Sequence, residues 1–239
     1  LYVTNNTGAG SIGKYTLSGS TVNASLVSGL IGPSGIALAN GNLYVTSSDP
    51  IDDNGKVGVY TTSGAVVNAS LITGLVNFGG IAVSGSNIFI SDSSSGTISL
   101  YSTSGALISA SFITGLSVPA GMAISGTTLY VTNSGNGKIG AYDTTSGATL
   151  NASLIGGLNS PFGIAVQGSE IYVSDSLANK IGKYTTVGTT VNASLVTGLN
   201  GPLGLVVVVP EPSTGLLLLL PLGGACLLGR RLISFSAES

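Results

Sequence analysis

Residues 22–26 read VNASL, and the same five residues return at 67–71 and at 191–195. Two near copies lie between them, ISASF at 108–112 and LNASL at 150–154. The second residues of the five copies are Asn23, Asn68, Ser109, Asn151 and Asn192, which gives steps of 45, 41, 42 and 41 residues. A fixed period of this length is typical of stacked or radially arranged modules.

Two other markers keep the same period. Triplets that resemble Gly-Ile-Ala begin at Gly35, Gly80, Gly121, Gly163 and Gly204. Triplets that resemble Leu-Tyr-Val begin at Leu1, Leu43, Ile88, Leu129 and Ile171. The pentapeptide is therefore one component of a larger repeating unit.

One repeat, residues 162–198, contains the apolar runs FGIAVQG, SEIYVSDS, NKIGKYTT and TTVNASLVTGL. Each run is short, is rich in β-branched or aromatic residues, and is bordered by Gly, Ser or Asn, as strands are. No segment of 1–200 shows a sustained helical period. Four antiparallel strands per repeat predict the blade of a β-propeller.

Within VNASL, apolar Val22, Ala24 and Leu26 alternate with polar residues. Because successive side chains of a strand point to opposite faces, this alternation predicts a half-exposed strand, the outermost of the blade. Asn-Ala-Ser is also a formal glycosylation acceptor. The copy with Ser109 lacks the asparagine, so a glycan is not what every repeat requires.

The repeats predict an all-β, five-bladed propeller over residues 1–209. Residues 1–30 hold the last three strands of one blade, and full blades follow at 32–75, 77–116, 118–158 and 160–199. The run PLGLVVVV (202–209) matches the missing first strand. Its pairing with the N-terminal blade would close the ring and remove exposed sheet edges. Because Leu1 falls inside a repeat marker, we expect a missing N-terminal part, and six blades are the alternative if a blade was lost with it.

The unit GPSGIALANGNLYVTSSDPIDDNGKVGVYTTSG (32–64) resembles the NHL repeat of β-propellers. The segment SPFGIAVQGSEIYVSDSLANKIGKYTTVG (160–188) is similar to it as well. The resemblance covers residues 1–209 and implies the fold, but propellers host both enzymes and binding platforms. The Arg or His that the family pattern has in the third strand is replaced here by Lys56, Lys138 or Lys180, or is absent.

The composition changes at Val209. The segment VPEPSTGLLLLLPLGGACLLGRR (209–231) resembles the PEP-CTERM sorting signal of exported bacterial proteins. Pro210, Glu211 and Pro212 form its motif, 215–229 its apolar stretch, and Arg230 and Arg231 its basic pair. The resemblance implies that residues 210–239 are a sorting tail, processed near the motif by an exosortase in a Gram-negative-type host that makes exopolysaccharide.

The apolar stretch predicts a short C-terminal hydrophobic helix. Its fifteen uncharged residues would span roughly 22 Å as a helix, less than a bilayer core of about 30 Å. We therefore expect a transient inner-membrane anchor with Arg230 and Arg231 on the cytoplasmic side. The protein would be exported and would end at the cell surface or in the extracellular matrix.

Charge and composition limit the chemistry. Charged residues make up 7% of the chain, and residues 1–209 carry five Lys and seven acidic residues, so there is no basic footprint for nucleic acid. The chain has no His, which excludes a Ser-His-Asp triad within it. The single Cys226 makes a zinc site unlikely and excludes an internal disulfide. No catalytic residue, metal ligand or cofactor is predicted.

One set of polar residues follows the second strand of each repeat: Asn5, Ser47, Asp92, Asn133 and Asp175. Symmetry is expected to place them on one rim of the ring. Such oxygens could hold a hard cation such as Ca²⁺ or form a polar pocket. The favoured alternative is that they cap strands and form turns.

These observations favour an exported surface or matrix propeller that is a non-enzymatic binding or structural module. Its expected partners are an exosortase and, through loops at one rim, extracellular polysaccharide or a surface protein. The competing hypothesis is a metal-dependent, lactonase-like hydrolase, since gluconolactonase-like propellers hold a central metal with carboxylate and amide oxygens. Asp92, Asn133 and Asp175 would take that role.

Overall fold

The computed structural model describes residues 1–205 except 7–8, 17–19 and 50–53. This part of the chain forms one three-stranded and four four-stranded antiparallel sheets, each a meander in chain order. The first blade holds β1 (Tyr2–Asn5), β2 (Gly10–Tyr15) and β3 (Thr21–Leu30). The second holds β4 (Ile36–Ala39), β5 (Asn42–Ser48), β6 (Gly55–Thr61) and β7 (Val66–Leu75).

The other three blades repeat this arrangement. The third holds β8 (Phe78–Ser84), β9 (Asn87–Asp92), β10 (Thr97–Ser102) and β11 (Leu107–Ile113). The fourth holds β12 (Pro119–Ser125), β13 (Thr128–Asn133), β14 (Lys138–Asp143) and β15 (Thr149–Ile155). The fifth holds β16 (Pro161–Gln167), β17 (Glu170–Asp175), β18 (Lys180–Thr185) and β19 (Thr190–Val196).

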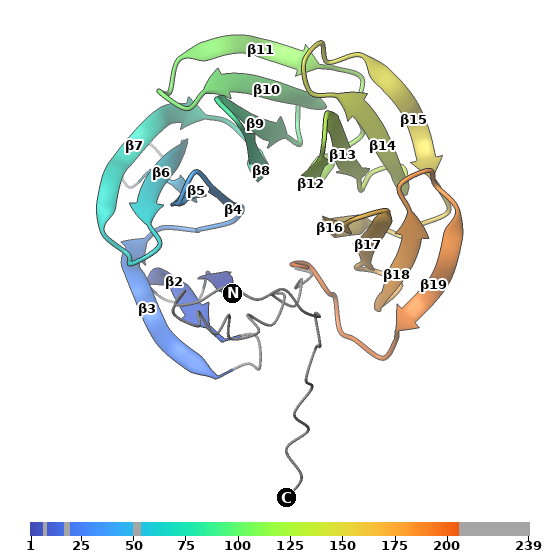
Figure 1. The fold of residues 1–239 in the computed structure, drawn as a ribbon, viewed down its shortest axis with the longest axis horizontal. Coiled ribbons are helices and arrows are strands. Elements are labelled where there is room, and N and C mark those ends of the chain that lie inside the picture. Colours follow the sequence, from blue (N-terminus) through green and yellow to red (C-terminus); the bar gives the residue numbers. More distant parts are fainter. Residues whose placement is uncertain (7–8, 17–19, 50–53, 206–239) are drawn as a thin grey trace, which may run out of the picture. The chain divides into compact units, whose positions relative to one another are not determined.

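The blades are arranged around a centre, as a propeller requires (Figure 1). Strands β4, β8, β12 and β16 lie nearest the centre, and β3, β7, β11, β15 and β19 lie at the periphery (Figure 1). The all-β, five-bladed prediction is confirmed, and the pentapeptide repeats do form the outermost strands. The predicted C-terminal helix falls outside the described residues.

The hydrophobic core lies between neighbouring blades. One cluster joins the third and fourth blades and contains the fully buried Phe89 and Leu129. Another joins the fourth and fifth blades around Ile139 and Ile171. Because each cluster uses side chains of two sheets, no blade buries its apolar surface alone, which is why the sequence must repeat.

A hydroxyl in the second strand of each repeat also connects each blade to the segment that follows it. In the three-stranded first blade this strand is β1. The donors and the carbonyl oxygens that accept are Thr4 and Ser34 (3.0 Å), Thr46 and Gly79 (3.2 Å), Ser91 and Ala120 (3.1 Å), Thr132 and Phe162 (2.9 Å), and Ser174 and Leu203 (2.9 Å). Leu203 therefore contacts the fifth blade in the same way that the inner segment of each other blade contacts the blade before it.

The glycines of the Gly-Ile-Ala markers permit this close approach. A Cβ added at Gly121 would overlap the carbonyl oxygen of Phe162, and one added at Gly163 would overlap that of Leu203. Larger residues at these positions would push neighbouring inner strands apart. The marker thus reflects contact between blades.

The predicted ring closure concerns the inner edge of the first blade. Val3 is 41% exposed there, whereas its counterparts Val45, Val131 and Val173 are at most 1% exposed. Residues 202–205 approach the fifth blade, but 206–209 lie outside the described residues, so their pairing with the N-terminal blade stays a prediction. The chain separates into Leu1–Val208 and Val209–Ser239.

The predicted alternation within VNASL is wrong. Residues 21–25 are all exposed, and Val22 is 55% exposed. The register explains this: Ile12 pairs with Val27 while Lys14 pairs with Asn23, so the outer strand carries two extra residues. Such a bulge breaks the two-residue alternation of side chains.

Candidate functional site

The five residues predicted to form a polar rim occupy equivalent places in the five blades. Asn5, Asp92, Asn133 and Asp175 end β1, β9, β13 and β17, and Ser47 is the penultimate residue of β5. Their burial differs, however: Asn5 is exposed and Asp92 half-buried, whereas Ser47, Asn133 and Asp175 are at most 2% exposed. The set therefore does not present five equivalent groups to solvent.

Two buried members of this set, Asn133 and Asp175, bind the loops that lead into their own blades. Asn133 Oδ1 accepts a hydrogen bond from the backbone N–H of Ser117 at 3.1 Å. Asp175 Oδ1 accepts one from the backbone N–H of Asn159 at 2.8 Å. These part-buried bonds satisfy backbone donors of the loops, which is the capping role considered for this set.

Asp92 makes a different local contact. Its Oδ1 accepts hydrogen bonds from the backbone N–H groups of Ser94 and Ser95, at 2.9 and 3.0 Å. This is the turn chemistry expected of an Asp at a strand end. Asp92, Asn133 and Asp175 are thus each bonded to backbone of their own blade or of the loop before it.

Within the part of the chain that the structure describes, no three His, Cys, Asp or Glu side chains are grouped so as to hold a metal ion. No helix among those residues is long and apolar enough to cross a membrane. The sorting motif Pro210–Pro212 and the pair Arg230 and Arg231 lie outside the described residues.

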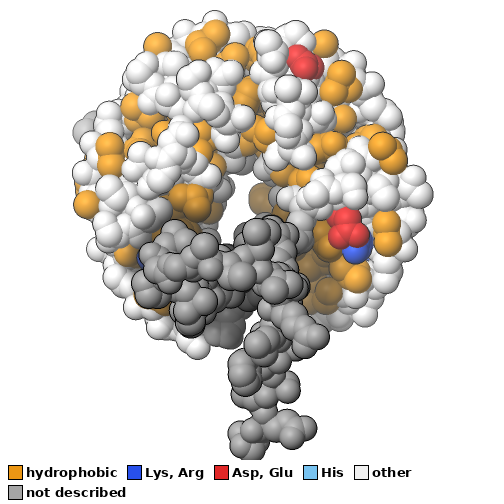
Figure 2. All heavy atoms as spheres, in the orientation of Figure 1, with side chains coloured by type: hydrophobic (Ala, Val, Ile, Leu, Met, Phe, Trp, Pro, Cys, Tyr) orange, Lys and Arg blue, Asp and Glu red, His pale blue; other side chains and the backbone are white. Residues whose placement is uncertain are grey.

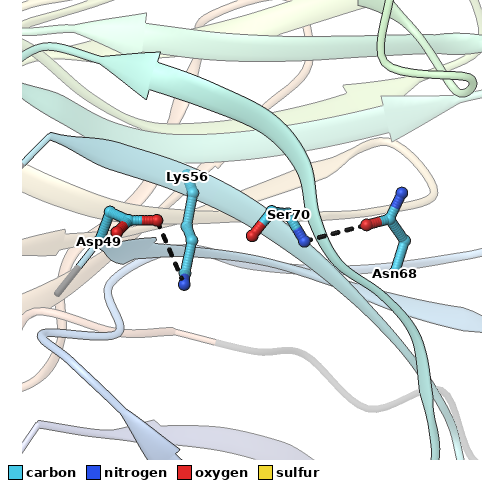
Figure 3. Close-up of polar contacts among 4 residues, drawn as sticks. All are labelled: Asp49, Lys56, Asn68 and Ser70. Atoms are coloured by element: carbon cyan, nitrogen blue, oxygen red, sulfur yellow. Dashed lines mark hydrogen bonds and ion pairs between the residues drawn. The ribbon is translucent and has the colours of Figure 1, made fainter. Parts of the chain in front are cut away.

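The recurring asparagines have a local structural role. Asn68 Oδ1 accepts a hydrogen bond from the backbone N–H of Ser70 at 3.0 Å (Figure 3). Asn23, Asn151 and Asn192 accept the same bond from the backbone N–H groups of Ser25, Ser153 and Ser194, at 3.0, 2.9 and 3.0 Å. The side chain satisfies a backbone donor within the bulge, so the Asn-Ala-Ser pattern follows from the shape of the outer strand.

Asp49, the first residue of the acidic sequence DPIDD (49–53), forms an ion pair. Asp49 and Lys56 approach to 3.5 Å between carboxylate and ammonium (Figure 3). Residues 50–53 lie outside the described residues. Lys56 is thereby held beside the groove between the first and second blades.

A tyrosine in the third strand packs over a glycine two residues earlier. A Cβ added at Gly58 would lie 2.6 Å from the Tyr60 hydroxyl oxygen, and Gly182 and Tyr184 show the same spacing. Tyr60, Tyr142 and Tyr184 are at most 4% exposed, and burial raises the pKa of each phenol. The charge of Asp175 raises the pKa of Tyr184 further.

The third blade departs from this pattern. Ser99 stands where the other blades have Gly13, Gly58, Gly140 and Gly182. Ser99 carries a Cβ and donates from Oγ to the carbonyl oxygen of Ala110 at 2.9 Å. A tyrosine ring cannot lie over that Cβ, and Tyr101 is half-buried.

A groove of about 330 Å³ lies at this departure, between the second and third blades. Leu75 and Val76 line it from the second blade, and Phe78, Asp92, Thr97, Ser99 and Tyr101 line it from the third. A related groove of about 240 Å³ lies between the first and second blades and includes Lys56 and Tyr60. Our sequence reasoning identified Asp92 but missed Thr97, Ser99 and Tyr101, although comparison of the third strands shows where this repeat differs.

The exposed surface carries few charges. On the face shown in Figure 2, hydrophobic side chains are scattered among uncharged polar groups, and acidic or basic side chains occur at only a few places. Much of the apolar exposure belongs to the outer strands, where Val66, Leu107 and Leu150 are 63%, 56% and 57% exposed. Such a surface suits contacts made through hydroxyls, amides and apolar groups.

No protein-family model and no curated protein matches the chain. Solved structures do match it. A chain of a nidogen/laminin complex aligns with a TM-score of 0.66 and 20% identity, over 85% of this chain and 78% of that chain. A catalytically inactive histidine-to-alanine variant of virginiamycin B lyase from Staphylococcus aureus, solved with quinupristin, aligns with a TM-score of 0.58 and 17% identity, over 85% and 72%.

A functionally unknown protein from Desulfotomaculum acetoxidans aligns with a TM-score of 0.56 and 21% identity, over 81% of this chain and 65% of that chain. The chain is a β-propeller. At these identities the likeness extends to the fold alone, and the neighbours include both a protein from a binding complex and a lyase. The finer resemblance to NHL repeats and the sorting signal stay predictions.

Proposed function

We propose that this protein is an exported β-propeller that acts as a non-enzymatic binding or structural module at the cell surface or in the extracellular matrix. The observation that carries the proposal is that the buried polar side chains of the rim bind backbone groups of the scaffold. Asn133 and Asp175, which the hydrolase hypothesis would need as metal ligands, are 2% exposed. They accept hydrogen bonds from backbone N–H groups of the loops that precede their blades. They contribute to the scaffold, and the exposed blades offer contact surface.

Export rests on the tail sequence. Pro210–Pro212, the apolar stretch and Arg230–Arg231 resemble an exosortase signal, in that order. The exosortase would be the processing partner, and the apolar stretch a transient anchor in the inner membrane. The released propeller would then meet extracellular polysaccharide or surface proteins.

The tail is tested in a Gram-negative host that has an exosortase. The full chain should appear at the cell surface or in the medium, shortened by the mass of the tail. Replacement of Glu211 by Ala or of both arginines by Ala should leave an unprocessed, membrane-associated form. Normal processing of these variants would refute recognition by an exosortase.

Binding is tested separately with the purified full chain. We expect retention on immobilised exopolysaccharide or on surface proteins of the host, without conversion of the ligand. Turnover of a lactone that requires added Ca²⁺ and disappears in Asp175→Ala, with folding intact, would instead support the hydrolase hypothesis.

A further inference from the structure

We propose that the groove between the second and third blades binds a neutral hexosyl unit of a polysaccharide. This inference rests on the binding function proposed above and names the ligand of one site. Its volume of about 330 Å³ falls at the lower end of the roughly 300–1,000 Å³ that small-molecule sites occupy. A single sugar ring with part of a neighbour is the ligand of that size.

The groove lies where one blade breaks the repeat, and it is larger than the related groove of about 240 Å³, where Tyr60 covers Gly58. In the second, fourth and fifth blades the third-strand tyrosine covers a glycine and is buried. Ser99 prevents this in the third blade, and Tyr101 lines the groove instead. A second departure lies nearby: Thr97 stands where Lys56, Lys138 and Lys180 stand in the other three complete blades.

The second departure changes the charge of the site. Thr97 is the register partner of Asp92, as Lys180 is of Asp175. The residues that line the groove therefore include a carboxylate but no lysine, whereas Lys56 lines the related groove. A carboxylate without a cation disfavours acidic sugars and accepts hydrogen bonds from neutral sugar hydroxyls.

The residues that line the groove offer both apolar and polar contacts to a pyranose ring. Phe78, which packs over Gly55 of the second blade, offers an aromatic surface to C–H groups. Beside it on the same sheet, its register partner Asp92 and the hydroxyl pair Ser95–Thr97, 2.8 Å apart, offer acceptors and donors to sugar hydroxyls. Tyr101 adds a ring and a phenol hydroxyl to the same wall.

The test is calorimetric titration of the full chain with neutral gluco-, manno- and galacto-tetraoses. At least one is expected to bind. Ser99→Gly restores the residue of the other blades, so the Tyr101 ring can cover residue 99 and narrow the groove toward the 240 Å³ of the related groove. We expect about tenfold or greater loss of affinity with an unchanged or higher Tm. Thr97→Lys should weaken binding to a similar degree, because the ammonium would pair with Asp92.

The matched control is Lys138→Thr, the converse change in the fourth blade, which should leave the affinity unchanged. If the native chain and the Ser99→Gly variant bind the tetraose with equal affinity, this groove is not the sugar site. The proposed binding function could then still belong to another part of the propeller. Failure of every neutral tetraose to bind at millimolar concentration would also overturn this site. Retention on exopolysaccharide or surface proteins would then show whether the broader function survives.

Discussion

Ser174 Oγ donates a hydrogen bond to the carbonyl oxygen of Leu203 at 2.9 Å and accepts one from the backbone N–H of Gly163 at 2.7 Å. The side chain is fully buried. It thus joins the fifth blade to the segment that follows β19, with the geometry that Thr132 provides between the fourth and fifth blades.

Removal of this hydroxyl should destabilise the fold. Ser174→Ala leaves a buried backbone N–H and a carbonyl oxygen without this partner, at an expected loss of about 1–3 kcal/mol in the free energy of unfolding. Urea denaturation measures it. Ser174→Thr is the matched control, since threonine makes the same bonds at Thr46 and Thr132. An alanine variant as stable as the native chain would show that the bond contributes nothing.

Closure of the ring can be tested by truncation. If residues 202–209 complete the first blade, a chain that ends at Val209 should retain the native Tm, whereas one that ends at Gly201 should melt several degrees lower. The physical reason is Val3, which is 41% exposed although its counterparts in complete blades are buried. Identical melting of the two truncated chains would argue that no such strand forms.

The bulges of the outer strands should limit association through sheet edges. Asn68→Val removes the acceptor for the Ser70 N–H, with an expected loss of about 0.5–1.5 kcal/mol. It also leaves a more regular, uncharged edge strand, which favours pairing between molecules. Light scattering should detect association at high concentration. Asn68→Asp retains the acceptor oxygen and adds a charge, so it should remain monomeric.

The buried tyrosines predict instability at alkaline pH. Burial raises the pKa of Tyr60, Tyr142 and Tyr184 above the ordinary value of 10.0. Because the folded state holds these protons more tightly, their contribution is fully present below the unfolded-state pKa and is lost as pH rises through the folded-state pKa. Unfolding should therefore accompany phenolate formation, which can be measured by the absorbance of the phenolate.

Tyr142→Phe provides the comparison for this pH effect. The variant should lose less stability between neutral and alkaline pH than the native chain, because one phenol no longer titrates. If the native chain and the variant show the same alkaline transition, Tyr142 does not contribute to it. A separate measurement at neutral pH gives the effect of removing the hydroxyl itself.

The sequence by itself determined the blades. The 41–45-residue period, the strand-like runs and the turn glycines predicted sheets that the structure contains within a few residues of the expected limits. Local rules suffice there because a four-strand meander forms from short connections and short-range pairing. The rim residues occupy equivalent places along the second strands of the repeat, since the repeat fixes their position in the chain, but they lie within those strands and do not follow them.

Only the tertiary structure decided what those residues do. The alternation of Val22 and Ala24 was misleading because the strand bulges, and a two-residue insertion in the pairing is not visible without the partner strand. Asn133 and Asp175 proved to bind loop backbone, which depends on the path of the chain between blades. The place of the Tyr101 ring likewise depends on packing, because a single Cβ at Ser99 excludes the ring from the place that a glycine leaves open in the other blades.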